Sequence, residues 1–119
     1  MARKTLLECS FLIPLRRDKN LSDGKRHKPA TWKWLRQQVH PFRGGTLARE
    51  AVAGWYLDPD TDDEVWDESW RYTLALSRRQ VRRLRVVLRE ACNVFEQKCI
   101  YLSVAGHVEF VWRSGHETR

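Results

Sequence analysis

The chain has 119 residues, with 22 Lys or Arg against 15 Asp or Glu for a formal net charge of +7, three Cys and six Trp. That length suits one domain, and a hydrophobic fraction of 42% is enough for a core, which excludes a disordered chain. No stretch approaches the roughly 18 apolar residues that a transmembrane helix needs. Three cysteines without a close pair fit reduced thiols, so we expect a soluble cytoplasmic protein.

The chain begins with a predicted strand and a loop. Apolar residues alternate with others over residues 5–15, which predicts a half-buried strand that stops near Pro14. Residues 16–29 are polar and basic and contain Asp23-Gly24, so we expect a mobile basic loop there.

A helix and two strands are predicted next. Thr31 can cap a helix over residues 32–40, and Pro41 ends it. Residues 46–57 and 65–76 each alternate, which predicts two strands that an acidic turn joins into an antiparallel hairpin.

The second helix has the clearest local signal. Ser77 and Gln80 form the pattern of a capping box, in which each side chain satisfies a backbone donor at the helix start. Apolar residues then recur at intervals of three and four from Val81 to Phe95, which predicts a core-facing helix to about Gln97.

A final β region is predicted over residues 99–112. Ala105-Gly106 is either a bulge in one long strand or the turn of a hairpin, and the alternation does not decide between them. The last residues, 113–119, are polar and expected to fray. The order β-α-β-β-α-β predicts one α+β domain over 1–119, ferredoxin-like, with a four-stranded antiparallel sheet and two helices on one face.

The predicted strands carry more large aromatic residues than two helices are expected to cover. An exposed apolar sheet face usually marks a contact with a partner, so we expect a homodimer or another protein to bind there. The residues of this predicted interface are Trp55, Trp66, Trp70, Tyr72, Tyr101 and Trp112.

The charges are arranged in blocks. Two basic segments, residues 16–43 and 71–89, flank an acidic segment, residues 58–68. Either the basic blocks bind a polyanion, or the acidic segment folds back on the basic helix. The candidate nucleic-acid-binding residues are Arg16, Arg17, Lys25, Arg26, Arg78, Arg82, Arg85 and Arg89. The basic-Gly-aromatic-Gly signature of RNA-recognition modules is missing.

Motifs for catalysis and cofactors are sparse. The chain has no phosphate-binding glycine loop and no C-x-x-C pair, so we predict neither a cofactor nor a metal site. The most enzyme-like set is His27 and His40, either of which could be a general base, with Glu109 and Tyr101 at the same sheet edge.

The sequence also resembles a family of small uncharacterised bacterial proteins. The resemblance covers most of the chain in order and rests on Phe11, Pro14, Asp23-Gly24, Trp32, Gly44-Gly45-Thr46, Gly54-Trp55, Asp67, Ser69, Tyr72, Phe95, Gln97 and the segment 100–111. It implies a compact α+β domain and carries no activity with it. Together these observations predict a non-catalytic binding or accessory protein. The alternatives are a direct RNA or DNA binder and a small enzyme with a His general base.

Overall fold

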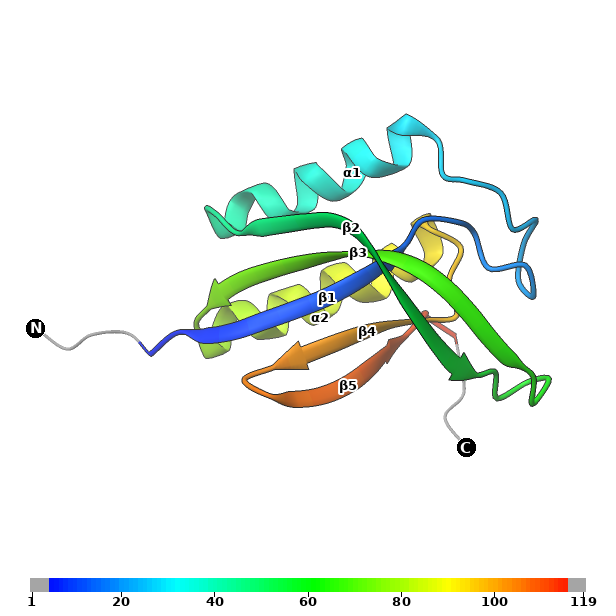
Figure 1. The fold of residues 1–119 in the computed structure, drawn as a ribbon. Coiled ribbons are helices and arrows are strands. Elements are labelled where there is room, and N and C mark those ends of the chain that lie inside the picture. The colour runs from blue at the N-terminus through cyan, green and yellow to red at the C-terminus, as the bar shows by residue number, and fades with distance from the viewer. Residues whose placement is uncertain (1–4, 116–119) are drawn as a thin grey trace, which may run out of the picture.

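The computed structural model describes residues 5–115, and Figure 1 shows how its helices and strands are arranged. In chain order they are β1 (Leu7–Pro14), α1 (Pro29–Val39), the 3-10 turn η1 (His40–Phe42), β2 (Thr46–Leu57), β3 (Glu64–Leu76), α2 (Arg78–Val94), β4 (Cys99–Val104) and β5 (His107–Trp112). The predicted fraying at the C-terminus lies partly outside the described residues. No described helix is long and apolar enough to cross a membrane.

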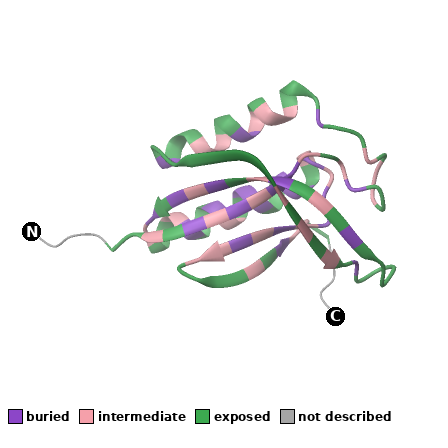
Figure 2. Ribbon diagram, in the orientation of Figure 1, coloured by how far each residue is buried: buried purple, intermediate pink, exposed green. Residues whose placement is uncertain are grey.

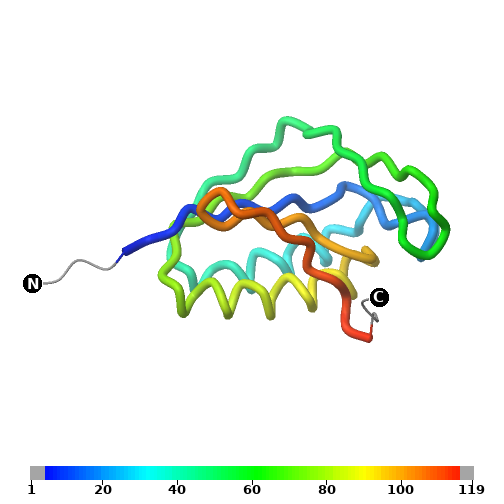
Figure 3. Tube along the Cα trace, turned by 90° about the horizontal axis from the view of Figure 1, so that it is seen from below, coloured from blue at the N-terminus to red at the C-terminus, as the bar shows by residue number. Residues whose placement is uncertain are grey.

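The strands form one antiparallel sheet in the order β2-β3-β1-β4-β5. Both helices lie on the same side of it, as the view from below shows (Figure 3). The α+β class and the two helices are therefore confirmed, but the predicted count of four strands is wrong, because residues 5–115 form five. Ala105 and Gly106 have φ of 49° and 83°. This left-handed pair makes the two-residue turn of a β4–β5 hairpin and decides the alternative that alternation left open.

The two helices begin in different ways. Ser77 and Gln80 form the predicted capping box of α2, whose helical residues end at Val94. The predicted cap of α1 is wrong, because Thr31 lies inside that helix and Lys28 is its N-cap without a side-chain bond. Pro29 starts α1 instead, since its fixed φ suits a first helical position where the missing N–H costs nothing.

The core lies between the sheet and the helices (Figure 2). Phe11 from β1 stacks on Tyr72 from β3 with ring centroids 5.0 Å apart, and Phe95 after α2 is fully buried. Trp70 packs against Trp32 of α1, with ring centroids 4.7 Å apart. Because Trp70 and Tyr72 share the helix-facing side of β3, the prediction that they belong to an exposed sheet face is wrong.

The remaining aromatic residues of the predicted interface lie in two separate places. Trp55 and Trp66 are a cross-strand pair in the outer half of the β2–β3 hairpin, and they are 58% and 63% exposed. Tyr101 meets Phe110 on the β4–β5 hairpin, and Trp112 is half-buried nearby. Association through these residues stays a prediction.

Candidate active site

A pocket of about 480 Å³ lies between the loop after β1 and the outer half of the β2–β3 hairpin. Its volume is in the range of small-molecule sites. The apolar lining comes from Leu15, Ala53, Val65 and Trp66. The charged lining comes from Arg16, Arg17, Asp18, Lys19, Arg26, Asp67 and Glu68. We call this the Asp67 pocket. It offers both signs of charge beside an apolar wall.

The loop that forms one wall is held by its own contacts. A β-bridge joins Arg16 to Arg26, and the Arg17 N–H donates to the Lys25 carbonyl at 2.8 Å. The Arg17 guanidinium donates two hydrogen bonds to Asp23, at 2.7 and 3.1 Å, and these lower the pKa of Asp23 to about 2. Arg17 is therefore neutralised, whereas Arg16 and Arg26 form no ion pair with a described residue.

Asp18 connects this loop to the hairpin. Its carboxylate accepts a hydrogen bond from the Tyr56 hydroxyl at 2.8 Å and from the Asn20 N–H at 2.7 Å, and the residue is 6% exposed. Burial and the bond to Asp18 raise the pKa of Tyr56. The phenol thus stays protonated and donates permanently to Asp18, which leaves the negative charge of Asp18 beside the pocket.

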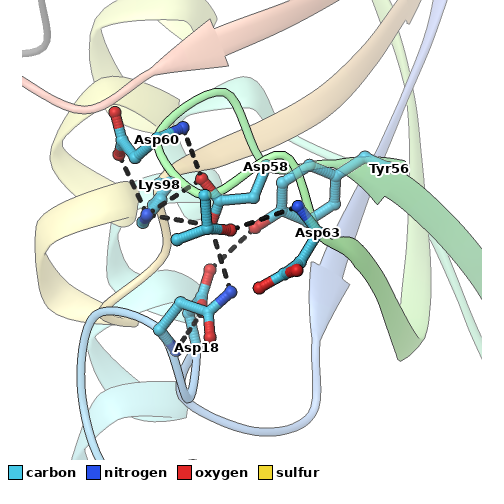
Figure 4. Close-up of polar contacts among 8 residues, drawn as sticks. Asp18, Tyr56, Asp58, Asp60, Asp63 and Lys98 are labelled. Atoms are coloured by element: carbon cyan, nitrogen blue, oxygen red, sulfur yellow. Dashed lines mark hydrogen bonds and ion pairs between the residues drawn. The ribbon is translucent and has the colours of Figure 1, made fainter.

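A buried ion pair ties the tip of the hairpin to the turn before β4 (Figure 4). The Lys98 ammonium lies 2.8 Å from Asp58 Oδ2 and 2.9 Å from Asp60 Oδ2, and Asp58 is completely buried. Burial alone would raise the pKa of Asp58, but hydrogen bonds from Lys98, the Asp60 N–H and Asn20 lower it. This ion pair fixes the hairpin tip, because breaking it would leave a buried charge without a partner.

Asp67 is a carboxylate of this pocket with a strongly raised pKa. It lies on β3 opposite Gly54, and burial, together with the charge of Asp18, raises its pKa to about 6. It makes no hydrogen bond with a described residue, and its oxygens are not sealed from solvent. An unpaired carboxylate in such surroundings favours a cationic ligand, which would relieve the cost of its charge.

The nearby Cys99 thiol is not a nucleophile of this site. Burial, followed by the charges of Asp67 and Asp18, raises its pKa to about 12. The thiol stays protonated at neutral pH, and the thiolate is the reactive form. Among residues 5–115, no group of three or more His, Cys, Asp or Glu could hold a metal ion.

The histidines and their expected companions do not gather at this site, so that prediction of placement is wrong. His27 is buried, and its Nε2 donates to the Pro14 carbonyl at 2.8 Å. Burial lowers the pKa of His27, which favours a neutral ring between aromatic neighbours. His40 begins η1 beyond the far end of α1. Glu109 bonds to Arg85, and Tyr101 contacts Phe110.

The predicted basic surface is divided between two places. Arg16, Arg17 and Arg26 line the Asp67 pocket, with Lys25 exposed beside them in the loop. The other four members, Arg78, Arg82, Arg85 and Arg89, lie on α2, where Arg85 forms a two-bond pair with Glu109. The acidic segment does not fold back on these arginines, because its ion pairs in the described chain are those of Asp58 and Asp60 with Lys98.

The sequence interpretation missed the residues that give this pocket its character: Asp18, Tyr56, Asp58, Asp67 and Lys98. The available signal was the acidic segment itself, which we interpreted as a turn and as one alternative partner of the basic helix. Asp67 alternates with Val65 and Ser69 on β3 and not with the helix-facing Trp70 and Tyr72, so the alternation of the strand did not mark it.

The fold is similar to that of two solved structures over almost the whole length of the chain. The particular similarity is to the solved structure described as phage SAM lyase in complex with S-methyl-5'-thioadenosine, with a TM-score of 0.68 and 12% identity over 98% of this chain and 97% of that one. The structure of phage SAM lyase in the apo state is also similar, with a TM-score of 0.59 and 16% identity over 98% of each chain. No protein-family model matches the chain, and no curated protein matches it in sequence.

This likeness corrects the functional predictions. The expectation of a non-catalytic binding or accessory protein is wrong, because the fold is one that an enzyme uses over its whole length. The alternative of an RNA or DNA binder is contradicted for the same reason. Both predictions gave the many arginines too much weight, since net charge reports on partners only weakly.

Proposed function

We propose that the chain is an enzyme that cleaves SAM, S-adenosylmethionine, or a closely similar sulfonium compound in the Asp67 pocket, and that it releases S-methyl-5'-thioadenosine. The whole-length likeness to phage SAM lyase supports the class of reaction. The observation that carries the proposal is Asp67, an unpaired carboxylate with a pKa near 6 that faces a pocket of suitable volume.

The chemistry of the pocket matches the charges of SAM. The substrate carries a sulfonium, an ammonium and a carboxylate, so its site needs groups of both signs. Asp67 supplies the negative charge for the ammonium end, and the unpaired Arg16 and Arg26 supply donors for the carboxylate. Trp66 is 63% exposed and offers a flat apolar face to the adenine ring.

The same pocket favours the bond cleavage. To form S-methyl-5'-thioadenosine, the bond between the sulfonium sulfur and the methionine side-chain carbon must break, and both electrons pass to sulfur. The substrate's own carboxylate oxygen forms a new bond to that carbon, so the rest of the methionine part leaves as a lactone and no further reactant is needed. The positive charge on sulfur is lost in that step, so contact of the sulfonium with the apolar lining residues favours the transition state over the charged substrate. Asp67 acts here by holding and orienting the substrate, which is a contribution to proximity.

The test is formation of S-methyl-5'-thioadenosine from SAM by the purified chain, followed by liquid chromatography. We expect turnover by the native chain and a loss of about 100-fold or more in Asp67→Asn, in keeping with loss of a positioning charge. Glu90→Gln, an exposed substitution on α2, is the matched control and should retain the native rate. A native chain that forms no product at micromolar enzyme concentration would refute the proposal.

We further propose that the sheet is a ferredoxin-like core to which β5 is added at one edge. The neighbouring order β2-β3-β1-β4 supports this, since β1 and β3 are central and antiparallel in that arrangement. We also propose that the enzyme acts in the cytoplasm. Its three cysteines are free, and two of them are buried, which suits a reducing compartment.

A further inference from the structure

A second pocket lies far along β3 from the Asp67 pocket and plays no part in the proposed reaction. It occupies about 560 Å³ where the end of α1 and η1 meet the start of β2. The end of α1 and the start of β2 lie at the left of Figure 1. Its inner surface is apolar, because Tyr72 and Leu74 are 7% and 5% exposed and Val39 and Leu47 flank them. We call it the Arg36 pocket.

The outer part of this pocket is basic and has no acidic residue. Arg36, His40 and Arg43 line it, and all three are exposed. Neither arginine forms an ion pair with another described residue. Elsewhere in the fold, Arg17 and Arg85 each bind a carboxylate through two hydrogen bonds. The guanidinium groups of Arg36 and Arg43 are therefore available to a ligand.

A polar group inside the pocket is also available. The Tyr72 hydroxyl makes no hydrogen bond with a described residue, and it is not sealed from solvent, since Arg113 Nε is the buried side-chain atom that lacks a partner within residues 5–115. Burial raises the pKa of Tyr72, while the charges of Arg49 and Arg36 act in the opposite direction. Arg36 and Tyr72 both line this pocket, so an anionic group bound there can contact both residues.

The backbone holds this arrangement in place. Arg43 has φ of 68°, a left-handed conformation that few residues other than glycine adopt, and its N–H donates to the His40 carbonyl at 3.0 Å. A Cβ on Gly45 would clash with the Leu74 side chain. The chain therefore turns sharply at Arg43 and runs back close against Leu74, which brings a guanidinium to the mouth of an apolar pocket.

We propose that the Arg36 pocket binds a small amphipathic anion, a molecule with one carboxylate or phosphate group and an apolar body of roughly eight to fifteen heavy atoms. Arg36 and Arg43 hold the anionic group, the Tyr72 hydroxyl donates to it, and the apolar body covers Leu47 and Leu74. The proposal stands on this pocket alone and is independent of cleavage of SAM.

The probe is sodium octanoate, titrated into the full chain and followed by two-dimensional NMR of backbone amides. Acetate tests the anion without the chain, and octyltrimethylammonium tests the chain with the opposite charge. We expect octanoate to shift the amide signals of Gly44, Thr46 and Leu47. Acetate and octyltrimethylammonium should bind at least about 10-fold more weakly, because each lacks one of the two contacts.

Variants locate the anionic group. Arg36→Gln with Arg43→Asn removes both charges, and Asn tolerates the left-handed backbone at position 43, so the fold is kept. Arg78→Gln, an exposed substitution on α2, is the matched control. We expect the double variant to raise the octanoate Kd by about 10-fold or more, as expected for lost charge-assisted bonds, and the control to leave it unchanged.

Three outcomes would overturn the proposal. The first is equal binding of octanoate by the double variant. The second is equal binding of acetate and octanoate, which would show general attraction to a basic surface. The third is binding to phosphatidylglycerol vesicles without binding to free octanoate, which would assign the same chemistry to a membrane headgroup instead of a small molecule.

Discussion

Replacing Asp67 with Asn should stabilise the fold at neutral pH while it abolishes the proposed activity. The pKa of Asp67 is raised from 3.8 to about 6, first by burial and then by the charge of Asp18. The native state therefore binds a proton more tightly than the unfolded state between those two pH values, and the stability of the native chain falls as pH rises through this range. Asn has the same shape and no charge, so the variant does not suffer this loss.

The shift of about two pKa units corresponds to about 3 kcal/mol at 1.36 kcal/mol per unit. Because Asp67 is only half-buried and partly screened, we expect about 2 kcal/mol of added stability at pH 8. In a domain of this length that would raise Tm by roughly 6–10 °C. The gain should vanish near pH 4, where Asp67 is protonated in the native state and Asn resembles it.

Urea unfolding of both chains at pH 4, 5, 6, 7 and 8 measures this difference directly. Glu68→Gln, one residue along the same strand but exposed, is the control and should change the free energy of unfolding by less than about 0.5 kcal/mol at every pH. A stability difference that is constant between pH 4 and pH 8, or a variant that is less stable throughout, would show that Asp67 is not held at an electrostatic cost.

Three further predictions concern the site and the sheet. The kcat/KM for SAM should rise with pH through about 6 and level off above 7, since the carboxylate form of Asp67 binds the substrate; a profile without that step would contradict its role. Lys98→Met should lower the free energy of unfolding by about 3–5 kcal/mol in urea titration, because it leaves Asp58 charged and buried; a loss below 1 kcal/mol would contradict this. Gly45→Ala should cost about 1–3 kcal/mol by the same measurement, because its Cβ would clash with the Leu74 side chain and lie 2.7 Å from the Thr73 carbonyl oxygen. Gly54→Ala, with nothing within 4 Å, is its control, and equal losses in the two would refute the crowding argument.

Local patterns predicted the helices and strands well where the signal lay within a few residues. The residues 46–57 form β2 with the predicted bounds, and Ser77 caps α2 as its capping box indicates. Thr31 failed as a cap because Pro29 offers an earlier start, and two adequate signals so close together cannot be ranked from sequence alone.

Long-range features were not predictable in the same way. Alternation shows that Trp70 and Tyr72 share a face, but it does not say which face the helices cover. Asp67 becomes unusual only through its burial and the nearness of Asp18, which is 49 positions away in the chain and reaches it through the loop after β1. The pKa of a group depends on such neighbours, so no local pattern could have given it.

The Asp67 pocket is lined entirely by the first 68 residues, yet its walls are fastened by residues much nearer the C-terminus. Lys98 holds the hairpin tip, and Glu96 accepts from Ser22 in the loop and binds Arg17 at 3.4 Å. During synthesis, all the lining residues would leave the ribosome before Glu96 and Lys98 do. The pocket therefore forms only when the segment after α2 packs against the loop after β1 and the hairpin tip. The chain gains the ability to bind a ligand there late in folding, at the same time as the sheet is completed.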